Sequence, residues 1–325
     1  MRRNFLKTAA SLAALALLPL GSAADTWPSK PIEFVVGYAA GGPTDVTARV
    51  LAQELSRTLG QSVVVTNKLG AASLVATQQF LRAKPDGYTF LFASLGHNVN
   101  PILMPDRATY DPVKDFDLVA SVAVQPLVVV TASSSNFSSL SEMLAAAKDK
   151  PESISFGSAG SGGSAHLAAE LLALQSGTKL LHVPFKGNGP ALAEVMSGRV
   201  SFMFYPSVGL TEQIAGGRLK VLAVAPSKGL KDFPNALTME KLGYKGFDDS
   251  APWVGLLAPK GTAPDIVRTM NEKVNAAMRQ PAVKKRLEDL GNALTGGTPA
   301  QFERQLVQST KAAERVVKFA NIKAE

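Results

Sequence analysis

Apolar residues along this chain fall into two alternating patterns. Short apolar runs at residues 32–36, 62–66 and 88–93 are typical of buried strands. Between them, apolar residues recur every three or four positions, as at residues 46–59, which indicates helices with one buried face. Because strands alternate with helices almost throughout, the chain is expected to fold as α/β, with mostly parallel sheets joined by right-handed crossovers.

A break in one apolar run predicts how the chain divides. The run at residues 118–131 contains Gln125 and Pro126 near its centre. Proline is poorly tolerated inside a central strand, so the chain is expected to leave one sheet there and enter another. A predicted strand at residues 219–225 then carries the chain back. The sequence therefore predicts a discontinuous first domain of residues 25–124 plus 226–325 and a second domain of residues 125–225.

Residues 157–166 form a loop of small residues between a predicted strand and a predicted helix. The loop contains four glycines and three serines, and apolar residues follow it at helical spacing over 167–174. A helix that begins after such a loop presents free backbone N–H groups and the positive end of its dipole, which favours an anion. A tight turn that needs glycine for positive φ and binds nothing is the alternative.

Residues 37–45 form a second strand–loop–helix unit of the same kind. Thr44 is expected to cap the following helix, and Asp45 stands in its first turn, where a carboxylate complements the dipole. Near a bound anion, Asp45 would either act through water or serve only the helix, and both interpretations stay open. Further polar loops after predicted strands lie at residues 94–100, 186–189 and 205–207.

The N-terminus has the three parts of an export signal. A basic start with the pair Arg2 and Arg3 precedes an apolar run at 9–20 and small residues at 21–24. The apolar run is shorter than the roughly 20 residues that span a bilayer. We expect a signal peptide at residues 1–24 that resembles a twin-arginine signal. The alternative is ordinary export by the Sec pathway, in which case the two arginines are adjacent by chance. The mature protein is expected in the periplasm.

Composition excludes several classes of site. The chain has 34 Lys and Arg against 26 Asp and Glu, a formal charge of +8, and three of the basic residues lie in the predicted signal. The remaining basic residues are dispersed, which argues against a nucleic-acid-binding face and mildly favours small anions. With no cysteine and three histidines, a disulfide framework, a thiolate nucleophile or a Cys- or His-rich metal site is not expected.

Sequence motifs of common catalytic and cofactor sites are missing. The loop at 157–166 lacks the lysine of a phosphate-binding loop and the spacing of the dinucleotide fingerprint. The chain contains no GxSxG or HExxH motif. A triad of Ser164, His166 and a distant aspartate is not persuasive, because the first two are too near in sequence. We therefore expect no catalytic residue, no metal and no cofactor.

Six segments in order resemble the Bug receptors, the periplasmic solute-binding proteins of tripartite tricarboxylate transporters. They are WPSKPI at 27–32, AAGGPTDVTAR at 39–49, KPDGYT at 84–89, GSAGSGGSAHLAAEL at 157–171, VPFKG at 183–187 and APKGT at 258–262. The resemblance implies a two-domain type II periplasmic binding protein of the Venus-flytrap kind, with a mixed, mostly parallel sheet in each domain. It also implies a monomer that captures a small carboxylate and delivers it to a permease with large and small membrane subunits.

The resemblance also implies which residues bind the ligand. The first glycine-rich loop, the second-domain loop and the lysine–glycine turn match family motifs, and the polar residues that end neighbouring strands complete the site. The candidates are Tyr38, Gly41, Gly42, Thr44, Asp45, Ser94, Asn98, Ser158, Ser161, Gly162, Ser164, Lys186, Gly187 and Ser207. One departure concerns Ala72 and Ser73, which stand where the family pattern has glycine.

Two other functions remain alternatives at this point. The chain would also suit a ligand-binding partner of a sensor kinase, and less well a small-molecule hydrolase on an α/β scaffold, which needs an activated nucleophile. Tyr38, Phe185, Phe204 and Tyr205 lie beside the predicted loops and either line the cleft or belong to the domain cores. A receptor predicts one-to-one binding, domain closure and no turnover.

Overall fold

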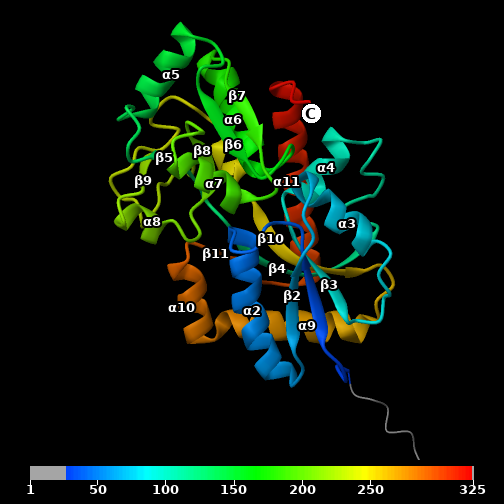
Figure 1. Cartoon of the computed structure of the whole chain (residues 1–325). Coiled ribbons are helices and arrows are strands. Elements are labelled where there is room, and N and C mark those ends of the chain that lie inside the picture. Colours follow the sequence, from blue (N-terminus) through cyan, green and yellow to red (C-terminus); the bar gives the residue numbers. More distant parts are fainter. Residues whose placement is uncertain (1–26, 324–325) are drawn as a thin grey trace, which may run out of the picture.

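The computed structural model describes residues 27–323, so the predicted signal peptide lies outside the described residues. Two α/β halves, each built around β-sheet, lie one above the other (Figure 1). Between residues 27 and 323, no helix combines the length and the apolar character needed to cross a membrane.

The first half is built on a six-stranded sheet with the order β11-β4-β10-β3-β1-β2. Its strands are β1 (Ile32–Val36), β2 (Val63–Asn67), β3 (Thr89–Ser94), β4 (Phe116–Val124), β10 (Trp253–Pro259) and β11 (Ala293–Leu294). Its helices are α2 (Pro43–Leu59), η2 (Ala71–Ser73), α3 (Leu74–Phe80), α4 (Gly96–Leu103), α9 (Pro264–Arg279), α10 (Pro281–Asp289) and α11 (Pro299–Phe319).

The second half contains a three-stranded sheet, β8-β5-β9, and a parallel pair, β6-β7, joined to it by a bridge between Phe156 and Phe202. Its strands are β5 (Leu127–Ala132), β6 (Ser155–Ser158), β7 (Leu181–Pro184), β8 (Met203–Pro206) and β9 (Leu219–Val224). Its helices are α5 (Leu140–Asp149), α6 (Ser164–Ser176), α7 (Asn188–Met196), α8 (Thr211–Ala215) and η3 (Phe247–Ser250).

The α/β class and the mixed sheets are confirmed, but the prediction that the sheets are mostly parallel is wrong in detail. β1 pairs in parallel with β2 and β3, and β6 with β7. β10 runs antiparallel to both β3 and β4, β11 is antiparallel to β4, and β5 is antiparallel to β8 and β9. β10 brings the chain back from the second half and runs against its neighbours, and the alternation of strands and helices does not reveal strand direction.

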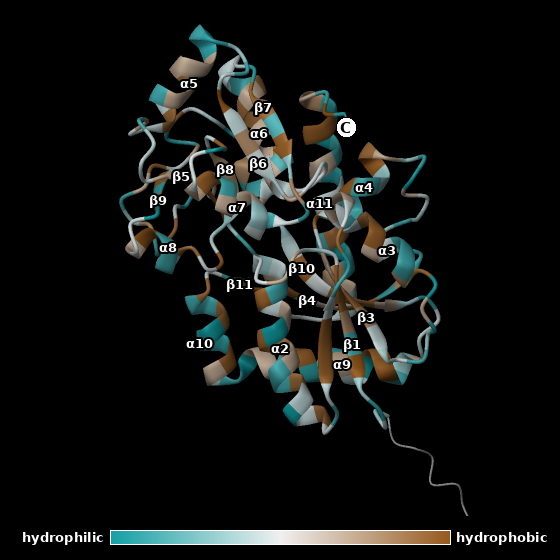
Figure 2. Cartoon of the chain, in the orientation of Figure 1, coloured by the Kyte–Doolittle hydropathy of each residue, from teal (hydrophilic) through white to brown (hydrophobic). Residues whose placement is uncertain are grey.

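Each half buries its own aromatic core, as Figure 2 suggests from the brown strands within helices that alternate brown and teal. In the first sheet the ring centroids of Phe34 and Phe92 lie 6.2 Å apart, and those of Phe34 and Phe90 lie 6.1 Å apart. In the second half, Phe204 stacks on Phe247 at 5.6 Å. Burying these side chains contributes about 1.5–3 kcal/mol each, so aromatic packing stabilises both halves.

The predicted break at Gln125 and Pro126 separates β4 from β5, and the chain crosses between the halves there. The domain boundaries themselves stay a prediction. Met239 and Phe247, beyond the second predicted crossover, are buried in the core cluster of the second half. Packing thus continues past β9 on the second half before β10 returns to the first sheet.

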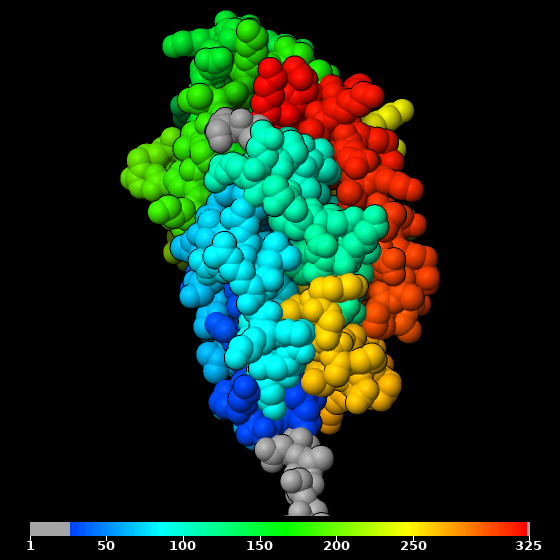
Figure 3. Space-filling model, turned by 90° about the vertical axis from the view of Figure 1, so that its right-hand side faces the viewer, coloured from blue at the N-terminus to red at the C-terminus, as the bar shows by residue number. Residues whose placement is uncertain are grey.

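The C-terminal helix α11 connects the halves along one side of the molecule. Phe302 and Leu306 are buried in a core cluster of the first half, whereas Val316 packs against clusters of both halves. In Figure 3 this helix, in red, runs upward from beside the first half to the green atoms of the second.

Helix starts agree only in part with the sequence prediction. Thr298 and Gln301 form a capping box at the start of α11. Ser139 caps α5, but the carboxylate of Glu142 accepts from Ser138 and not from the Ser139 N–H. The prediction that Thr44 caps α2 is wrong: Pro43 starts the helix early, and Gly42 is its N-cap.

The segment from Ala71 to Ser73 has three successive residues in the left-handed region. Their φ angles are 44°, 46° and 77°, which explains why the family pattern has glycine here. Asn100 Nδ2 donates to the carbonyls of Ala71 and Ala72 at 3.3 and 3.2 Å and so holds the segment in place. Ser73 Oγ is buried without a partner among the described residues, and a Cβ at Gly37 would lie only 1.9 Å from it.

Replacing Ser73 with glycine is therefore expected to stabilise the protein by about 1 kcal/mol. The substitution removes left-handed strain of about 1–2 kcal/mol and a buried unpaired hydroxyl, and loses about 0.5–1 kcal/mol to the greater backbone freedom of glycine. Urea unfolding measures the change. As a control, glycine at Ala145, an exposed residue inside α5, should destabilise by about 1 kcal/mol. Equal destabilisation by both substitutions would contradict the strain argument.

Candidate functional site

A small buried cavity lies between the two halves, where loops from both meet. The first half contributes residues after β1 and β3 and on either side of the crossings between halves, and the second contributes residues beside β6, α6, α7 and β8. The lining residues are Tyr38, Thr44, Ser94, Leu95, Gln125 and Pro252 on one side and Ala159, Ser164, Asn188 and Pro206 on the other. The cavity volume is about 10 Å³, close to the room that one water molecule needs.

Three helices begin at this cavity. Thr44, Ser164 and Asn188 line it, and they stand in the first turns of α2, α6 and α7. The N-caps of these helices are Gly42, Gly163 and Gly187, and none makes a side-chain cap. The amide N–H groups of a first turn lack intrahelical acceptors and carry the positive end of the dipole. Both halves therefore direct uncapped helix N-termini at one cavity, an arrangement that suits an anion.

Asp45 lies beside the cavity but is fully engaged by its own neighbours. Its carboxylate accepts from the Gly41 N–H at 2.8 Å, from Arg49 Nε at 2.9 Å and from Asn67 Nδ2 at 2.8 Å. Burial raises the pKa of Asp45, but the hydrogen bonds from Arg49, Asn67 and Gly41 outweigh it and hold that pKa below its ordinary value. Asp45 is therefore an ionised brace for the first loop, and the lining residues themselves carry no charge.

The polar groups of the cavity wall are neutral donors and acceptors. Burial raises the pKa of Tyr38 to about 12, so its phenol keeps its proton, and it donates to the Ala72 carbonyl at 3.4 Å. Gln125 Nε2 donates to the Thr47 hydroxyl at 3.2 Å and to Asn292 Oδ1 at 3.1 Å, which ties the crossing to α2. Asn188 Oδ1 is buried without a partner among the described residues, so it is a group that a ligand can satisfy.

The second-half loop is held by its own hydrogen bonds. Ser158 Oγ lies 2.6 Å from His182 Nε2 and accepts the Gly160 N–H at 3.1 Å. The Gly162 N–H donates to His166 Nδ1 at 3.1 Å. These contacts fold residues 158–163 into the turn that precedes α6.

The two halves touch where only glycine leaves room. A Cβ at Gly187 would lie 2.7 Å from Ala39 Cβ, and a Cβ at Gly160 would lie 3.0 Å from the Ala72 nitrogen. Ala159 of the second half packs into the core cluster of the first. The structure is therefore a closed arrangement around a nearly filled cavity.

The structure brings together some of the candidate residues and not others. Tyr38, Thr44, Ser94 and Ser164 line the cavity, whereas the remaining ten have other positions. Six of the ten shape the loops behind the cavity, as described above: Gly41, Gly42, Asp45, Ser158, Gly162 and Gly187. In the same loops, Ser161 is half-buried and Lys186 is exposed. Asn98 and Ser207 are not among the residues that line the cavity.

Asn98 and Ser207 have structural contacts instead. Asn98 accepts from Trp253 Nε1 at 3.1 Å and is completely buried. Most of the predicted loop at residues 94–100 instead lies in α4, whose residues 96–100 are all buried, and Asn98 is used inside the core. Ser207 donates to the Gly291 carbonyl at 3.0 Å, at the crossing between halves.

Sequence reasoning missed six lining residues, Leu95, Gln125, Ala159, Asn188, Pro206 and Pro252. Asn188 lies inside the predicted loop 186–189, so its amide was a signal in the sequence. Gln125 was interpreted only as part of the crossing. Ala159, Leu95 and the two prolines have no side-chain chemistry that marks a site.

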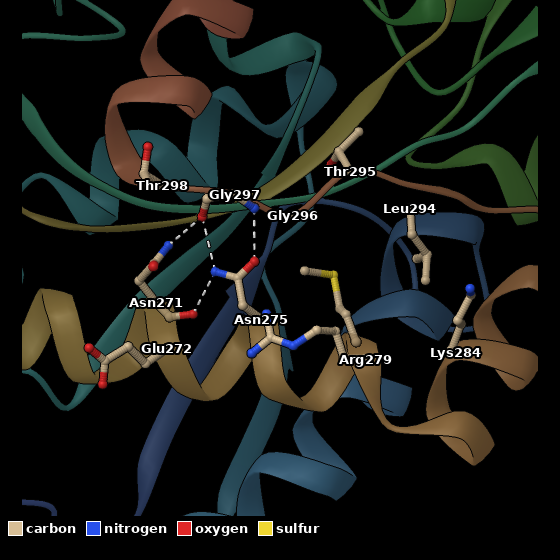
Figure 4. Close-up of a pocket in the computed structure, with 11 residues that line it drawn as sticks. Asn271, Glu272, Asn275, Arg279, Lys284, Leu294, Thr295, Gly296, Gly297 and Thr298 are labelled. Carbon is tan, nitrogen blue, oxygen red and sulfur yellow. Dashed lines mark hydrogen bonds between the residues drawn. The ribbon is translucent and has the colours of Figure 1, made fainter.

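A larger groove of about 630 Å³ lies on the outer side of the first half, between α9, α10 and the loop before α11 (Figure 4). The side-chain amides of its two asparagines are already paired. Asn271 and Asn275 donate to the Gly297 carbonyl at 2.9 and 3.0 Å, and Asn275 Oδ1 accepts the Gly297 N–H. The helix that starts there is capped by Thr298. The groove is lined by residues of the first half alone, among them the charged Glu272, Arg279 and Lys284, whereas both halves form the small cavity.

The serine–histidine arrangement that a hydrolase would use is not formed by Ser164 and His166. Ser164 and His166 do not form a hydrogen-bonded pair among the interactions of the described residues. The serine that does approach a histidine, Ser158, is completely buried and accepts a loop amide. Within residues 27–323, no cluster of three His, Cys, Asp or Glu side chains could hold a metal ion.

Comparison with known proteins identifies the relatives of this chain. The family profile described as "Tripartite tricarboxylate transporter family receptor" matches residues 47–322. The structure titled "Structure of periplasmic binding protein BugD" is 32% identical, with a TM-score of 0.87, and the match covers 92% of this chain and 100% of that one.

Two similar structures contain ligands. One is titled "R. palustris Rpa4515 with adipate"; it is 28% identical, with a TM-score of 0.87, covering 92% of this chain and 100% of that one. The other is MatC from Rhodopseudomonas palustris with bound malate. It is 31% identical, with a TM-score of 0.85, covering 90% of this chain and 100% of that one.

Alanine at Gly187 is expected to disfavour the closed arrangement. The added Cβ would overlap Ala39 of the opposite half, and overpacking of this kind disfavours a state by about 1–3 kcal/mol. Small-angle X-ray scattering should then report a larger radius of gyration. Gly198→Ala is the matched control, because Gly198 also has positive φ, 76°, but has nothing within 4 Å of the added Cβ. The same radius for both variants would contradict closure through this contact.

Stability is expected to fall as the pH falls from 7 towards 5. Burial lowers the pKa of His97 to about 4, and burial followed by the neighbouring His182 lowers that of His166 to about 3. In the unfolded chain both titrate near 6.5, so below that pH only the unfolded state binds the protons. The expected loss is on the order of 1 kcal/mol per pH unit for each histidine. Urea unfolding measures it, and His97→Phe should remove the share of His97; a flat profile from pH 7 to 5 would contradict both assignments.

Proposed function

Because this chain belongs to the tripartite tricarboxylate transporter receptor family, whose members are solute-binding receptors, we propose that it captures a small carboxylate between its two halves. The receptor acts in the periplasm and hands its ligand to a permease with large and small membrane subunits. Related structures contain adipate and malate, which supports a ligand with one or two carboxylates on a short carbon frame.

One observation carries the proposal. The uncapped N-termini of α2, α6 and α7 converge on a cavity whose lining has no charged side chain. Free backbone N–H groups and hydroxyls can hold a carboxylate by charge-assisted hydrogen bonds without a salt bridge. Donors fixed in the backbone lose little entropy when the ligand binds, so they discriminate by geometry.

The ligand groups divide between the two halves. The first turn of α2, with Thr44 and the loop braced by Asp45, contacts the ligand from the first half. The first turns of α6 and α7, with Ser164 and Asn188, contact it from the second. The Asn188 amide, whose Oδ1 is unpaired, accepts a hydroxyl or donates to a carboxylate of the ligand.

Binding requires the halves to separate first. A cavity of about 10 Å³ holds one water molecule, and a dicarboxylate needs several times that room. Opening occurs at the crossings near Gln125 and Pro252, which are the covalent links that a hinge can use. The ligand then bridges the loops and replaces part of the contact between Gly187 and Ala39.

The proposed receptor has no catalytic role. The ligand is bound by neutral donors, and the buried Ser158 has no access to it. We therefore expect one-to-one binding and recovery of the ligand unchanged. Conversion of a bound carboxylate at steady state would contradict the proposal.

A thermal-shift screen of mono-, di- and tricarboxylates tests the ligand class, with calorimetry of each compound that shifts the melting temperature. A ligand at 100 times its Kd should add about 2.7 kcal/mol of stability. Mass spectrometry of the purified protein identifies any ligand that it retains. If neutral solutes stabilise the protein and carboxylates do not, the anion site is wrong.

Proline at Ser164 tests the backbone donors directly. Gly163 has φ −72° and ψ 161°, which a residue before proline adopts, and α2 already begins with proline. The variant should fold, but it lacks the first N–H and the hydroxyl of α6. Affinity for the carboxylate found in the screen should fall about 10- to 100-fold, since a hydrogen bond to a charged group contributes about 1.5–3 kcal/mol.

Lys284→Ala is the control for the Ser164→Pro variant. Lys284 lies on the exposed side of α10, away from the cavity, so its replacement should leave affinity within twofold. Equal affinity of both variants would contradict a role for the α6 N-terminus in binding. Delivery is tested separately, by uptake of the identified carboxylate in cells that lack this chain; unchanged uptake would contradict transport.

A further inference from the structure

Two histidines behind the second-half loop have no role in the site described so far. His166 lies in the first turn of α6 and is 3% exposed, and His182 lies in β7. Their rings stack at 4.1 Å with an angle of 14° between the planes, and His182 stacks on Phe156 at 4.8 Å. Each ring contacts the loop through one nitrogen, at Gly162 and Ser158 respectively.

The hydrogen bond to Gly162 fixes the protonation of His166. Since Nδ1 accepts the Gly162 N–H, it carries no proton, and the neutral ring has its proton on Nε2. Glu170 Oε1 lies 3.9 Å from that nitrogen. Burial and the adjacent His182 lower the pKa of His166 to about 3, so the ring is neutral at physiological pH.

This contact takes the place of a capping-box acid. His166 is the third residue of α6, the position at which Glu or Gln of a capping box accepts an N–H from the residues before the helix. Gln301 does so at the start of α11, where it accepts the Thr298 N–H at 2.7 Å. In α6 the accepted N–H belongs to Gly162, one residue before the N-cap.

A carboxylate at position 166 would interact favourably with the helix dipole but would repel a carboxylate ligand. A negative charge in the first turn stabilises a helix by about 0.3–1 kcal/mol. The same charge would repel a carboxylate ligand at the N-terminus of α6. It would also offset the positive end of the helix dipole, which attracts the ligand. The neutral imidazole satisfies the Gly162 amide and leaves the end of the helix available.

We propose that His166 is a positioning residue that accepts the Gly162 N–H as an uncharged group, so that the loop is fixed without an anion at the ligand end of α6. This inference rests on the proposed function, since it explains how the carboxylate site is kept free of negative charge. His182 supports it by stacking on His166 and holding the Ser158 hydroxyl.

Asparagine and aspartate at position 166 separate charge from shape. Either side chain places an oxygen where Nδ1 stands, and both lose the same stacking contact with His182. We expect His166→Asn to keep most of the affinity for the carboxylate identified in the screen. His166→Asp should bind at least tenfold more weakly than His166→Asn, measured at a temperature at which both variants are fully folded.

That pattern is the opposite of what a purely structural histidine gives. If His166 only supports the fold, affinity should follow melting temperature in both variants, and Asp and Asn should bind alike. Ser139→Ala is the matched control for stability: it removes the cap of α5 in the same half, should lower the melting temperature and should leave affinity unchanged.

A ligand-free measurement keeps the inference independent of the proposed function. In the wild-type protein, the Gly162 amide should be protected from hydrogen exchange, and nitrogen NMR should show His166 Nδ1 without a proton at pH 7. His166→Phe should lose the Gly162 protection. If no carboxylate binds the wild type, the proposed function fails; if one binds and the Asp and Asn variants are equal, this inference fails.

Discussion

The unsatisfied amide N–H groups at the starts of three helices are the constraint on which the site depends. Helices α2, α6 and α7 each begin after a glycine and have no side-chain cap. Their first turns lie at one cavity. Groups of this kind must find acceptors or stay hydrated. A protein that exchanges water for a carboxylate at these positions gains charge-assisted hydrogen bonds without placing a lysine or arginine in its cleft. Because these donors belong to the backbone, their positions do not depend on which carboxylate is bound.

The negative charge near that cavity is already paired, so it does not repel a bound carboxylate. Asp45 is ionised and buried, but its oxygens are used by Gly41, Arg49 and Asn67, so it stiffens the first loop through contacts that point away from the lining. In the second loop the corresponding brace is the neutral His166. The two halves thus solve one problem in two ways: the first neutralises its carboxylate with an arginine, and the second avoids a carboxylate altogether.

Where the two halves approach each other closely, the backbone adopts conformations that most residues avoid. Gly187 and Gly160 leave room that a Cβ would fill, and Ala71 to Ser73 adopt the left-handed region without being glycine. Strain of about 1–2 kcal/mol per residue persists only where surrounding contacts hold it, here the Asn100 amide on two of the three carbonyls. Strained residues at a contact between moving halves make closure sensitive to small changes there.

The sequence alone determined the α/β class, the alternation of elements, the break at Gln125 and Pro126 and the glycine-rich loops before helices, because each depends on local periodicity or on the backbone limits of glycine and proline. Its motifs also determined the family. Only the tertiary structure decided which loop residues meet. It turned Asn98 into the core through an unforeseen helix and selected Asn188 and Gln125 for the cavity. It gave Asp45 and His166 their partners and set β10 and β11 antiparallel to β4. These outcomes depend on contacts between residues far apart in the chain, such as Asn98 with Trp253, which no local pattern contains.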